Sequence, residues 1–471
     1  MTSLDKIGHM KAAAEPSGNH LAVELTETLK LAVPIALTQL GQIAMMTTDL
    51  ALIGRLGDAA VAAAALAHTV FFVTFTFGMG LVSAVAPLAA QAFGARNPRL
   101  VRRALRVGLW AALLISLPMM MLPLYGEQIL LALGQVPATA HLAQQYLRGL
   151  ARGIAPALWF LAIRGFMGAV NRPEPGLWIT LAAIPANAVL VYLLIRGELG
   201  LPRLELFGAG LATTTVNFGM FLAGLWFAHR RRPFRKYQLL GNLWRIDWML
   251  MRQLIVIGAP ISLSFLMEYG LFAAAALLMG LIGTTALAAH QIALQVTAIL
   301  FMVPFGIGMA ATVRVGHAVG RNDAAAVKRA GLIATLLGIA IVSVMTLTVI
   351  LARFAIARFF FGEAVESAVI ELTATLLMVG ATFFVADGIQ TVAAGALRGM
   401  NDTRIPLLFA AISYWVVGFT AAYGLAFWTK FGAVGVWIGL SCGTAIYAIL
   451  LILRFRLLAG RMQGRDLTRR N

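Results

Sequence analysis

Charge and cysteine are both scarce in this sequence, and each shortage excludes a class of protein. Only 12% of the 471 residues are charged and 60% are hydrophobic, which is far from the balance of a soluble domain. The one cysteine, Cys442, leaves no partner for a disulfide within the chain and no cysteine metal site. Residues 1–28 have no short apolar core followed by a small-residue cleavage site, so we predict no cleaved signal peptide. The composition indicates an integral membrane protein.

Apolar stretches long enough to cross a bilayer recur along the whole chain. A transmembrane helix needs about 20 mostly apolar residues. We predict membrane spans at 29–53, 64–88, 107–124, 142–166, 176–196, 207–228, 254–281, 290–313, 330–352, 372–397, 406–427 and 432–453. The sequence therefore predicts an all-α membrane protein with twelve transmembrane helices.

The basic residues follow the predicted spans. The net charge is +18, and most of the basic residues lie in every second loop. The basic segments are 96–106, HRRRPFRK at 229–236, 321–329 and 454–470. Under the positive-inside rule, this pattern predicts that these loops and both termini are cytoplasmic. Because topology accounts for the basic excess, we expect no nucleic-acid partner.

The second half of the chain repeats the first. LAVPIALTQLGQ at 31–42 aligns with IGAPISLSFLME at 257–268, and LGDAAVAAAAL at 56–66 aligns with IGTTALAAHQI at 282–292. Each half holds six spans, an even number, so both halves enter the membrane in the same direction. A pseudo-two-fold axis along the membrane normal can then relate the two halves, an arrangement typical of transporters.

This repeat divides the chain into two six-helix lobes with a connecting segment. We predict a cytoplasmic N-terminal segment at 1–28, an N-lobe at 29–228, a basic cytoplasmic linker at 229–253, a C-lobe at 254–453 and a basic cytoplasmic tail at 454–471. A solute path is expected to run between the lobes.

Three carboxylates lie inside predicted spans: Asp49 in the first, Glu268 in the seventh and Asp387 in the tenth. On insertion scales, a carboxylate at the centre of a helix costs about 2.5–3.5 kcal/mol. No Lys or Arg stands within one helical turn of any of the three, so a local ion pair does not explain them. Ionisable residues inside a membrane usually serve transport, and we predict that these three bind the coupling cation or proton.

Polar faces accompany the two carboxylates of the second half. Side chains at helical spacing in three spans are predicted to line a substrate cavity: Ser264, Tyr269, Gln291, Gln295, Phe383, Gln390 and Thr391. Lipid would leave the polar groups without hydrogen bonds, so we expect these faces to share one hydrated cavity. Nearby Phe and Met side chains would suit a cation with an apolar body.

The first half carries a smaller polar set. Gln42 and Asp49 lie two turns apart on one helix face, while Asn187 and Thr213 stand on two later spans. A carboxylate, an amide and a hydroxyl on three helices could form an oxygen-lined site for a cation or a proton, with Gln42 lining the cavity. The alternative is that Asn187 and Thr213 only make hydrogen bonds between helices.

Three motifs connect these residues to a known family. They are AAHQIAL at 288–294, RVGHAVGRND at 314–323 and DGIQTVAAGALRGMNDTRIP at 387–406. With them, the sequence resembles the multidrug and toxic compound extrusion (MATE) transporters, in the NorM-like branch, from about residue 25 to 455. The resemblance implies two V-shaped lobes and export of cationic amphipathic compounds, driven by inward flow of sodium or protons. We further expect a monomer in the membrane lipid of the bacterial inner membrane, with no cofactor.

The resemblance also implies residue roles. Glu268 and Asp387 match the acidic residues of spans seven and ten, which could together hold a sodium ion, and Asp49 matches the first-span aspartate. Two departures weaken a sodium assignment. Phe383 stands where some members have a tyrosine, and Val191 stands where many have a second Asn or Asp after Asn187.

Other functions remain open at this point. A flippase for lipid-linked precursors is the nearest alternative, although an anionic pyrophosphate would require arginines in the cavity. A membrane enzyme is not expected, because the sequence has no HExxH and no Ser/Lys or Ser/His constellation. A passive channel would not need two halves with different acidic residues.

Overall fold

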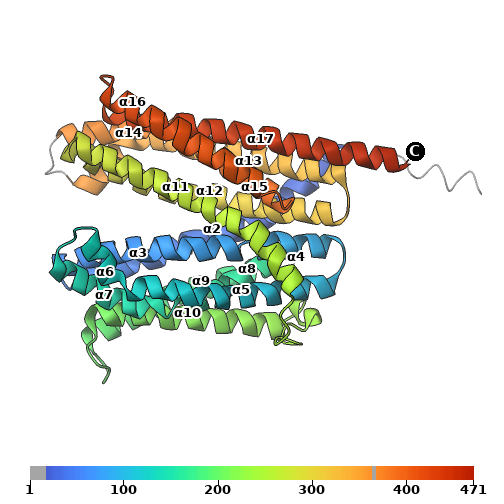
Figure 1. The fold of residues 1–471 in the computed structure, drawn as a ribbon, viewed down its shortest axis with the longest axis horizontal. Helices are drawn as coiled ribbons and strands as arrows, with labels where there is room; N and C mark the ends of the chain where they lie inside the picture. The colour runs from blue at the N-terminus through green and yellow to red at the C-terminus, as the bar shows by residue number, and fades with distance from the viewer. Residues whose placement is uncertain (1–16, 363–366, 471) are drawn as a thin grey trace, which may run out of the picture.

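The structure is a computed structural model, and it describes residues 17–362 and 367–470. Helices make up all the regular structure in these ranges, and they run nearly parallel in two lobes (Figure 1). The predicted all-α fold is confirmed. Among the described residues, eleven helices are long and apolar enough to cross a membrane, or twelve if the bent pair α7 Pro137–Ala151 and α8 Ile154–Ala169 forms one span.

The N-lobe comprises the first nine helices of the described chain. They are α2 Ser17–Gly54, α3 Asp58–Val82, α4 Val85–Gly94, α5 Pro98–Leu124, α6 Gly126–Ala132, α7 Pro137–Ala151, α8 Ile154–Ala169, α9 Glu174–Arg196 and α10 Glu205–Arg230. Two of the predicted spans are divided: α3 and α4 together cover the second, while α7 and α8 cover the fourth with a bend of 46°.

The C-lobe follows a connecting segment that holds one short 3-10 helix, η1 Phe234–Tyr237. Its helices are α11 Trp248–Ile282, α12 Thr284–Gly320, α13 Ala324–Phe361, α14 Ser367–Gly399, α15 Arg404–Ala410, the π-helix η2 Ala411–Phe419, α16 Thr420–Phe427 and α17 Ala433–Arg470. The eleventh predicted span is thus made of α15, η2 and α16 in succession.

Several helices extend well beyond the apolar stretches that predicted them. Residues 17–28, expected to be a polar segment, form the start of α2, and the expected tail from 454 continues α17. Polar ends remain helical where partners satisfy them. In α2, Glu24 accepts two hydrogen bonds of 2.8 Å from Arg314 of α12. Asp247 accepts from the backbone N–H of Leu250 and caps the start of α11.

The first helix of each lobe packs against both lobes. The helix α2 packs against α12 and α13 of the C-lobe and against α9 and α10 of its own lobe. Glu24 near its start contacts Arg314 of α12, and Asp49 near its end contacts α9 and α10. The helix α11 packs against α3 and α5 of the N-lobe and against η2 and α17 of its own lobe. Each of the two helices contains a proline, Pro34 or Pro260. Proline interrupts the helical hydrogen-bond ladder and permits a bend.

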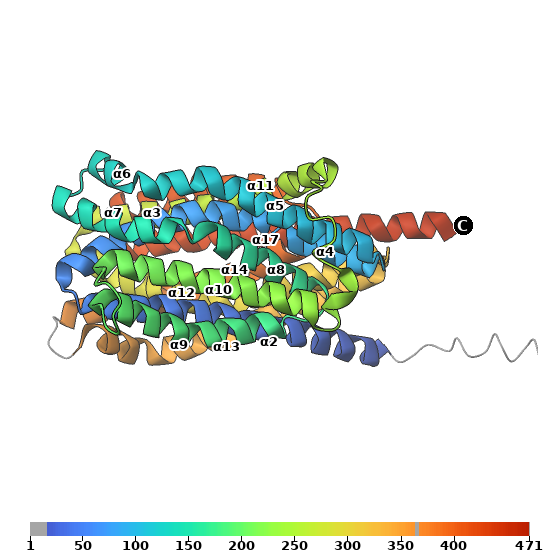
Figure 2. The same cartoon turned by 90° about the horizontal axis from the view of Figure 1, so that it is seen from below.

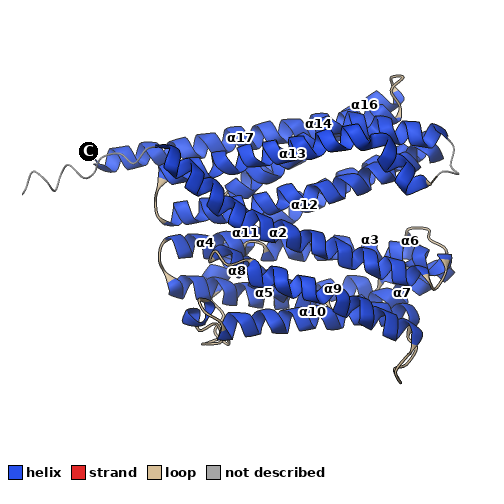
Figure 3. Ribbon diagram, turned by 180° about the vertical axis from the view of Figure 1, so that it is seen from behind, coloured by secondary structure: helices blue, strands red, loops and turns tan. Residues whose placement is uncertain are grey.

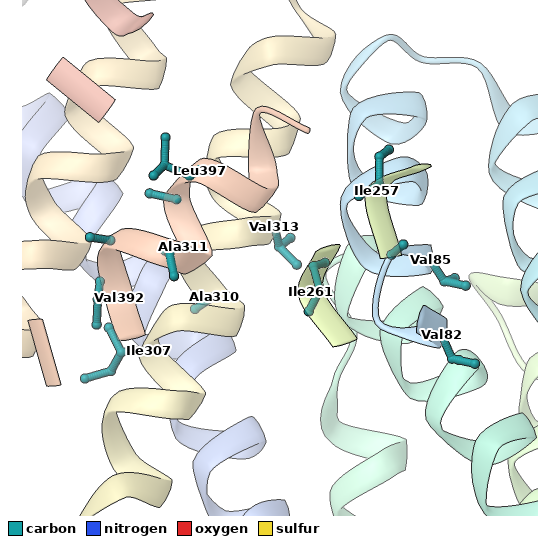
Figure 4. Packing of buried hydrophobic residues seen from close by; sticks show 14 of the residues in the cluster. Val82, Val85, Ile257, Ile261, Ile307, Ala310, Ala311, Val313, Val392 and Leu397 are labelled. Atoms are coloured by element: carbon teal, nitrogen blue, oxygen red, sulfur yellow. The ribbon is translucent and has the colours of Figure 1, made fainter. Parts of the chain in front are cut away.

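Both ends of the described chain lie at the same end of the molecule (Figure 2). The lobes contact each other closely at this end. Close-up, Ile257 and Ile261 of α11 lie beside Val82 and Val85 of the N-lobe, with Val313 of α12 nearby (Figure 4). Glycines permit the helix backbones to approach closely. A Cβ at Gly258 would stand 2.4 Å from the carbonyl oxygen of Leu81, and one at Gly320 would stand 2.1 Å from that of Gln91.

Polar contacts also join the lobes at this end. Gln91 of α4 donates to the carbonyl oxygen of Gly399 at 2.8 Å and accepts from Asn401 at 2.9 Å. Ser262 of α11 donates to the carbonyl oxygen of Phe77 at 2.6 Å. Seen from behind, the lobes run side by side and their central helices α11, α12 and α3 face one another (Figure 3).

Candidate functional site

The two carboxylates of the C-lobe share one amide. Gln390 of α14 donates from Nε2 to Asp387 Oδ1 at 2.9 Å and to Glu268 Oε1 at 3.2 Å. Asp387 is 4% exposed and Gln390 is 3% exposed. The structure therefore brings Glu268 of α11 and Asp387 of α14 into one cluster, although they are far apart in the sequence.

A small cavity adjoins this cluster. The helices α11, α12, α14 and α17 and the π-helix η2 supply its walls, which are Ser264, Phe265, Glu268, Phe301, Phe305, Gln390, Thr391, Ala394, Arg398, Tyr414 and Tyr447. Both polar and aromatic groups line it, as in sites for amphipathic ligands.

One lining residue is basic, although most of the basic residues were predicted to lie in loops. Arg398 of α14 lies in the same cavity as Glu268, and its guanidinium stands 4.8 Å from the ring centroid of Phe265. It makes no ion pair within 4.0 Å among the described residues. Arg398 is eleven residues, or about three turns, beyond Asp387, so the helix brings it to the same face. Arg398 was not predicted as a cavity residue, because it lies just beyond the predicted tenth span, 372–397.

Two tyrosines were also missed. Tyr414 and Tyr447 line the cavity with rings 5.0 Å apart, and both are buried. Tyr414 lies within the π-helix η2, where an extra residue per turn reorients the side chains. Such distortions are frequent at functional sites. A single-sequence hydropathy pattern does not reveal a π-helix, so nothing distinguished this tyrosine from a tyrosine in ordinary core packing.

The structure distributes the other predicted C-lobe residues differently. Ser264 and Thr391 line the cavity, but their hydroxyls donate to carbonyl oxygens of their own helices. Phe383 does not line it, because its ring packs edge-on against Phe272 and Trp437. Tyr269 lies 5.2 Å from Phe72 of α3, ring to ring, and so faces the N-lobe.

Gln291 and Gln295 of α12 lie outside the cavity and are exposed. They share a helix face with Gly306, whose backbone lies against Ala36 of α2. The two amides therefore face the N-lobe, beyond the point where the lobes touch. The helical period directs the C-lobe polar faces in different directions, so the structure does not bring all of these side chains to the cavity beside Glu268.

In the N-lobe, the structure gathers the predicted amide and hydroxyl, Asn187 and Thr213, around the Asp49 carboxylate. Asn187 of α9 donates from Nδ2 to Asp49 Oδ1, and Thr213 of α10 donates to Asp49 Oδ2 at 3.1 Å. Asp49 is 4% exposed and Asn187 is fully buried. Gln42 lies on the same face of α2, half-buried, and Val191 is buried beside this group in the lobe core.

The sequence reading missed two further residues beside Asp49. Tyr146 of α7 is buried, and its hydroxyl lies near enough to the Asp49 carboxylate to interact with it electrostatically. His68 of α3 is half-buried, and its Nε2 lies 3.3 Å from that hydroxyl. Tyr146 was not predicted, because residues 142–166 read as a single apolar span and the sequence gives no sign of the bend between α7 and α8.

The two carboxylate clusters belong to different lobes and use different helices. No group of three or more His, Cys, Asp or Glu side chains in residues 17–362 and 367–470 could hold a metal ion. A metal ion in the C-lobe would therefore have two carboxylates at most, with neutral oxygens completing its shell.

Comparison with known sequences identifies the chain. The MatE family profile matches residues 34–193 and 260–424, one match in each half. The chain belongs to the MATE family. It is 69% identical over 466 residues to a probable multidrug resistance protein NorM of Bradyrhizobium diazoefficiens, covering 98% of this chain and 100% of that one. It is 60% identical over 447 residues to a probable NorM of Rhodopseudomonas palustris, covering 94% of each.

Solved structures show the same fold at low sequence identity. A crystal structure of a MATE protein in a bent conformation matches with a TM-score of 0.86 at 18% identity, covering 96% of this chain and 100% of that one. The eukaryotic MATE transporter AtDTX14 matches with a TM-score of 0.84 at 20% identity, covering 94% and 99%. The protein is thus an integral membrane efflux transporter of the MATE family, in its NorM-like branch.

Proposed function

We propose that this transporter exports cationic, amphipathic compounds in exchange for inward-moving protons, with sodium as the alternative coupling ion. The observation that carries the proposal is the pair of carboxyl groups of the half-buried Glu268 and the buried Asp387, bridged by the Gln390 amide. A buried carboxylate can be neutralised by a proton, a metal ion or an organic cation, but only by one at a time. Because the substrate and the proton compete for the same carboxylates, export of the substrate is coupled to the inward movement of protons.

The donors around the carboxylates support protons as the coupling ion. Hard cations in proteins take about six oxygen ligands. In the C-lobe, the Gln390 N–H groups point at both carboxylates, where a metal ion would need oxygens, and Phe383 offers no oxygen. A proton needs only one carboxylate, so the sparse oxygen supply favours it.

Asp49 has a partner suited to both protonation states. Asn187 donates to its carboxylate from Nδ2, while Asn187 Oδ1 is buried and has no hydrogen-bond partner among the described residues. If Asp49 takes a proton, rotation of the amide presents Oδ1 as the acceptor. The unsatisfied oxygen would then gain a partner, which supports reversible protonation at this position.

Orientation and substrate class belong to the same proposal. Under the positive-inside rule, the basic segments favour a cytoplasmic location for the end carrying both termini, in a bacterial inner membrane. On this orientation, the lobes are closed toward the cytoplasm. While both carboxyl groups are ionised, they outnumber Arg398 and give the C-lobe cluster a net negative charge, which favours a cationic passenger over an anionic one. Once a proton replaces the substrate at the carboxylates, the lobes return to the conformation that binds substrate from the cytoplasm.

We expect wild-type protein in liposomes to export ethidium when a proton gradient is imposed in sodium-free buffer. Asp49→Asn should block that export at any sodium concentration, because the amide cannot take up and release a proton at neutral pH. The measurement is dye transport with proton and sodium gradients imposed separately. Thr215→Val is the matched control, since the Thr215 hydroxyl is exposed and donates only to its own helix. Transport that stops completely without sodium, whatever the proton gradient, would refute proton coupling.

The charge of the substrate should decide recognition. Among aromatic compounds of similar size, cations should compete with ethidium for export and anions such as fluorescein should not, because the cluster is net negative. Competition assays in the same liposomes measure the difference.

A second candidate function rests on Arg398. An arginine in the cavity is what a flippase for anionic lipid-linked precursors would need. Efficient export of an anion that is unaffected by ethidium would favour this candidate and contradict the cationic substrate class.

A further inference from the structure

A group of arginines lies where α5 meets the segment joining the two lobes. Arg102, Arg103 and Arg245 all lie near enough to act electrostatically on Arg106, and Asp247 is the only carboxylate among these neighbours. Indeed, Asp247 is the only acidic residue in 206–267, and no acidic residue occurs in 59–126. Four guanidinium groups therefore face one carboxylate, a concentration of positive charge with no matching counter-charge in the chain.

The single carboxylate is already occupied. Arg103 donates from Nε to Asp247 Oδ2 at 2.8 Å, and Asp247 also caps α11. The hydrogen bond from Arg103 lowers the pKa of the Asp247 carboxyl below its usual range, so this group stays ionised and paired. Asp247 is therefore not available as a hydrogen-bond acceptor for Arg102 and Arg106.

These two arginines have unused donors. Arg106 is 8% exposed, and it donates from Nη1 to the carbonyl oxygen of Asn242 at 3.2 Å. Arg102 lies against Gly241 of the connecting segment. The Nε atoms of both are buried and have no hydrogen-bond partner among the described residues. A buried charged donor without an acceptor is unfavourable, which indicates that an acceptor completes the site.

The surface beside the arginines is apolar and aromatic. Trp244 is 89% exposed, Trp248 is 66% exposed and Met249 is 84% exposed. The same segment is fixed to the N-lobe from beneath, because Trp110 of α5 donates to the carbonyl oxygen of Leu243 at 2.6 Å. Tryptophan prefers the boundary between lipid headgroups and acyl chains. The segment thus presents its apolar side chains at the membrane surface, next to the positive charge.

We propose that the arginines at 102, 106 and 245, with Trp244 and Trp248, form a binding site for one anionic phospholipid of the leaflet at the end carrying both termini. The phosphate oxygens accept from the free Nε donors, and guanidinium groups suit phosphate well. The acyl chains lie over the tryptophans. A free phosphate would use only the arginines, whereas a lipid uses both features, which is why we commit to the lipid.

The test uses the full-length protein, purified in neutral detergent and stripped of lipid. Short-chain phosphatidylglycerol, phosphatidylcholine and inorganic phosphate are titrated separately, with bound lipid counted by native mass spectrometry and thermal unfolding followed in parallel. We expect one tightly bound phosphatidylglycerol per chain and a raised unfolding temperature, with much weaker effects from the other two. Equal stabilisation by phosphatidylcholine, or full stabilisation by inorganic phosphate, would overturn the proposal.

Variants assign the effect to these residues. Arg106→Gln and Arg102→Gln should each weaken phosphatidylglycerol binding about tenfold, because each removes a charge-assisted hydrogen bond. Arg404→Gln, an exposed arginine at the same end of the C-lobe, is the control and should bind as the wild type does. If the buried Arg106 variant does not fold, the half-buried Arg102 variant decides the question. Unchanged binding in Arg102→Gln would overturn the proposal.

Discussion

Glu268→Gln and Asp387→Asn should each reduce gradient-driven ethidium export to background, while the protein accumulates in the membrane at wild-type levels. The charge is what competes for protons and cations, and an amide cannot supply it. Folding should not suffer, because removing a carboxylate from a helix centre relieves about 2.5–3.5 kcal/mol of insertion free energy. The substituted side chains can still accept from Gln390 Nε2, so the cluster keeps its shape. Dye transport and membrane abundance are measured on the same preparations.

Glu371→Gln provides the control on α14, because Glu371 is exposed and lies outside the cavity. It removes a carboxylate from the same helix and should leave export unchanged. Full export by either the Glu268 or the Asp387 variant would show that the C-lobe pair does not couple the two fluxes.

Gly258→Ala should hold the lobes apart at the end carrying both termini and lower export about ten- to a hundredfold. The new Cβ would stand 2.4 Å from the carbonyl oxygen of Leu81 and 2.9 Å from its Cα, so backbone has to move. Such overpacking costs about 1–3 kcal/mol. Because the cost falls only on the closed arrangement, it shifts the population toward the open one by the corresponding factor.

Electron spin resonance distances between labels at Ala95 and Arg321 report the closure, in a background that lacks Cys442. Both positions are exposed at the ends of α4 and α12. The distance should lengthen in Gly258→Ala. It should not change in Gly280→Ala, where the same helix has nothing within 4 Å of an added Cβ. An unchanged distance and full export in Gly258→Ala would show that this contact does not govern closure.

The hydropathy pattern predicted the fold well because each transmembrane helix must satisfy its own backbone in lipid, which makes every span a local signal. The places where it was incomplete are places where the local signal is ambiguous. The bend between α7 and α8 interrupts a stretch that is apolar throughout. The ends of α2 and α17 are polar, and they stay helical through partners that only the tertiary structure supplies.

For the candidate site too, some residues could be identified from the sequence, and others depend on how the helices pack. The positions of Asp49, Glu268 and Asp387 could be read from the sequence, because a carboxylate stands out in an apolar span. That Gln390 would donate to two carboxylates on different helices depends on the packing of α11 against α14. Arg398 could have been found by following the face of Asp387 for three turns. Tyr414 could not, since a π-helix leaves no periodic mark in a single sequence.

The packing of α2 and α11 against both halves bears on how such a protein could have arisen. Each first helix packs within its own half and also against the other half. Two separate copies of an ancestral six-helix chain, related by a two-fold axis, could make the same reciprocal contacts as a symmetric dimer. Joining those copies end to end preserves the contacts. It also frees each copy to acquire its own carboxylates, because the pairing no longer has to be symmetric.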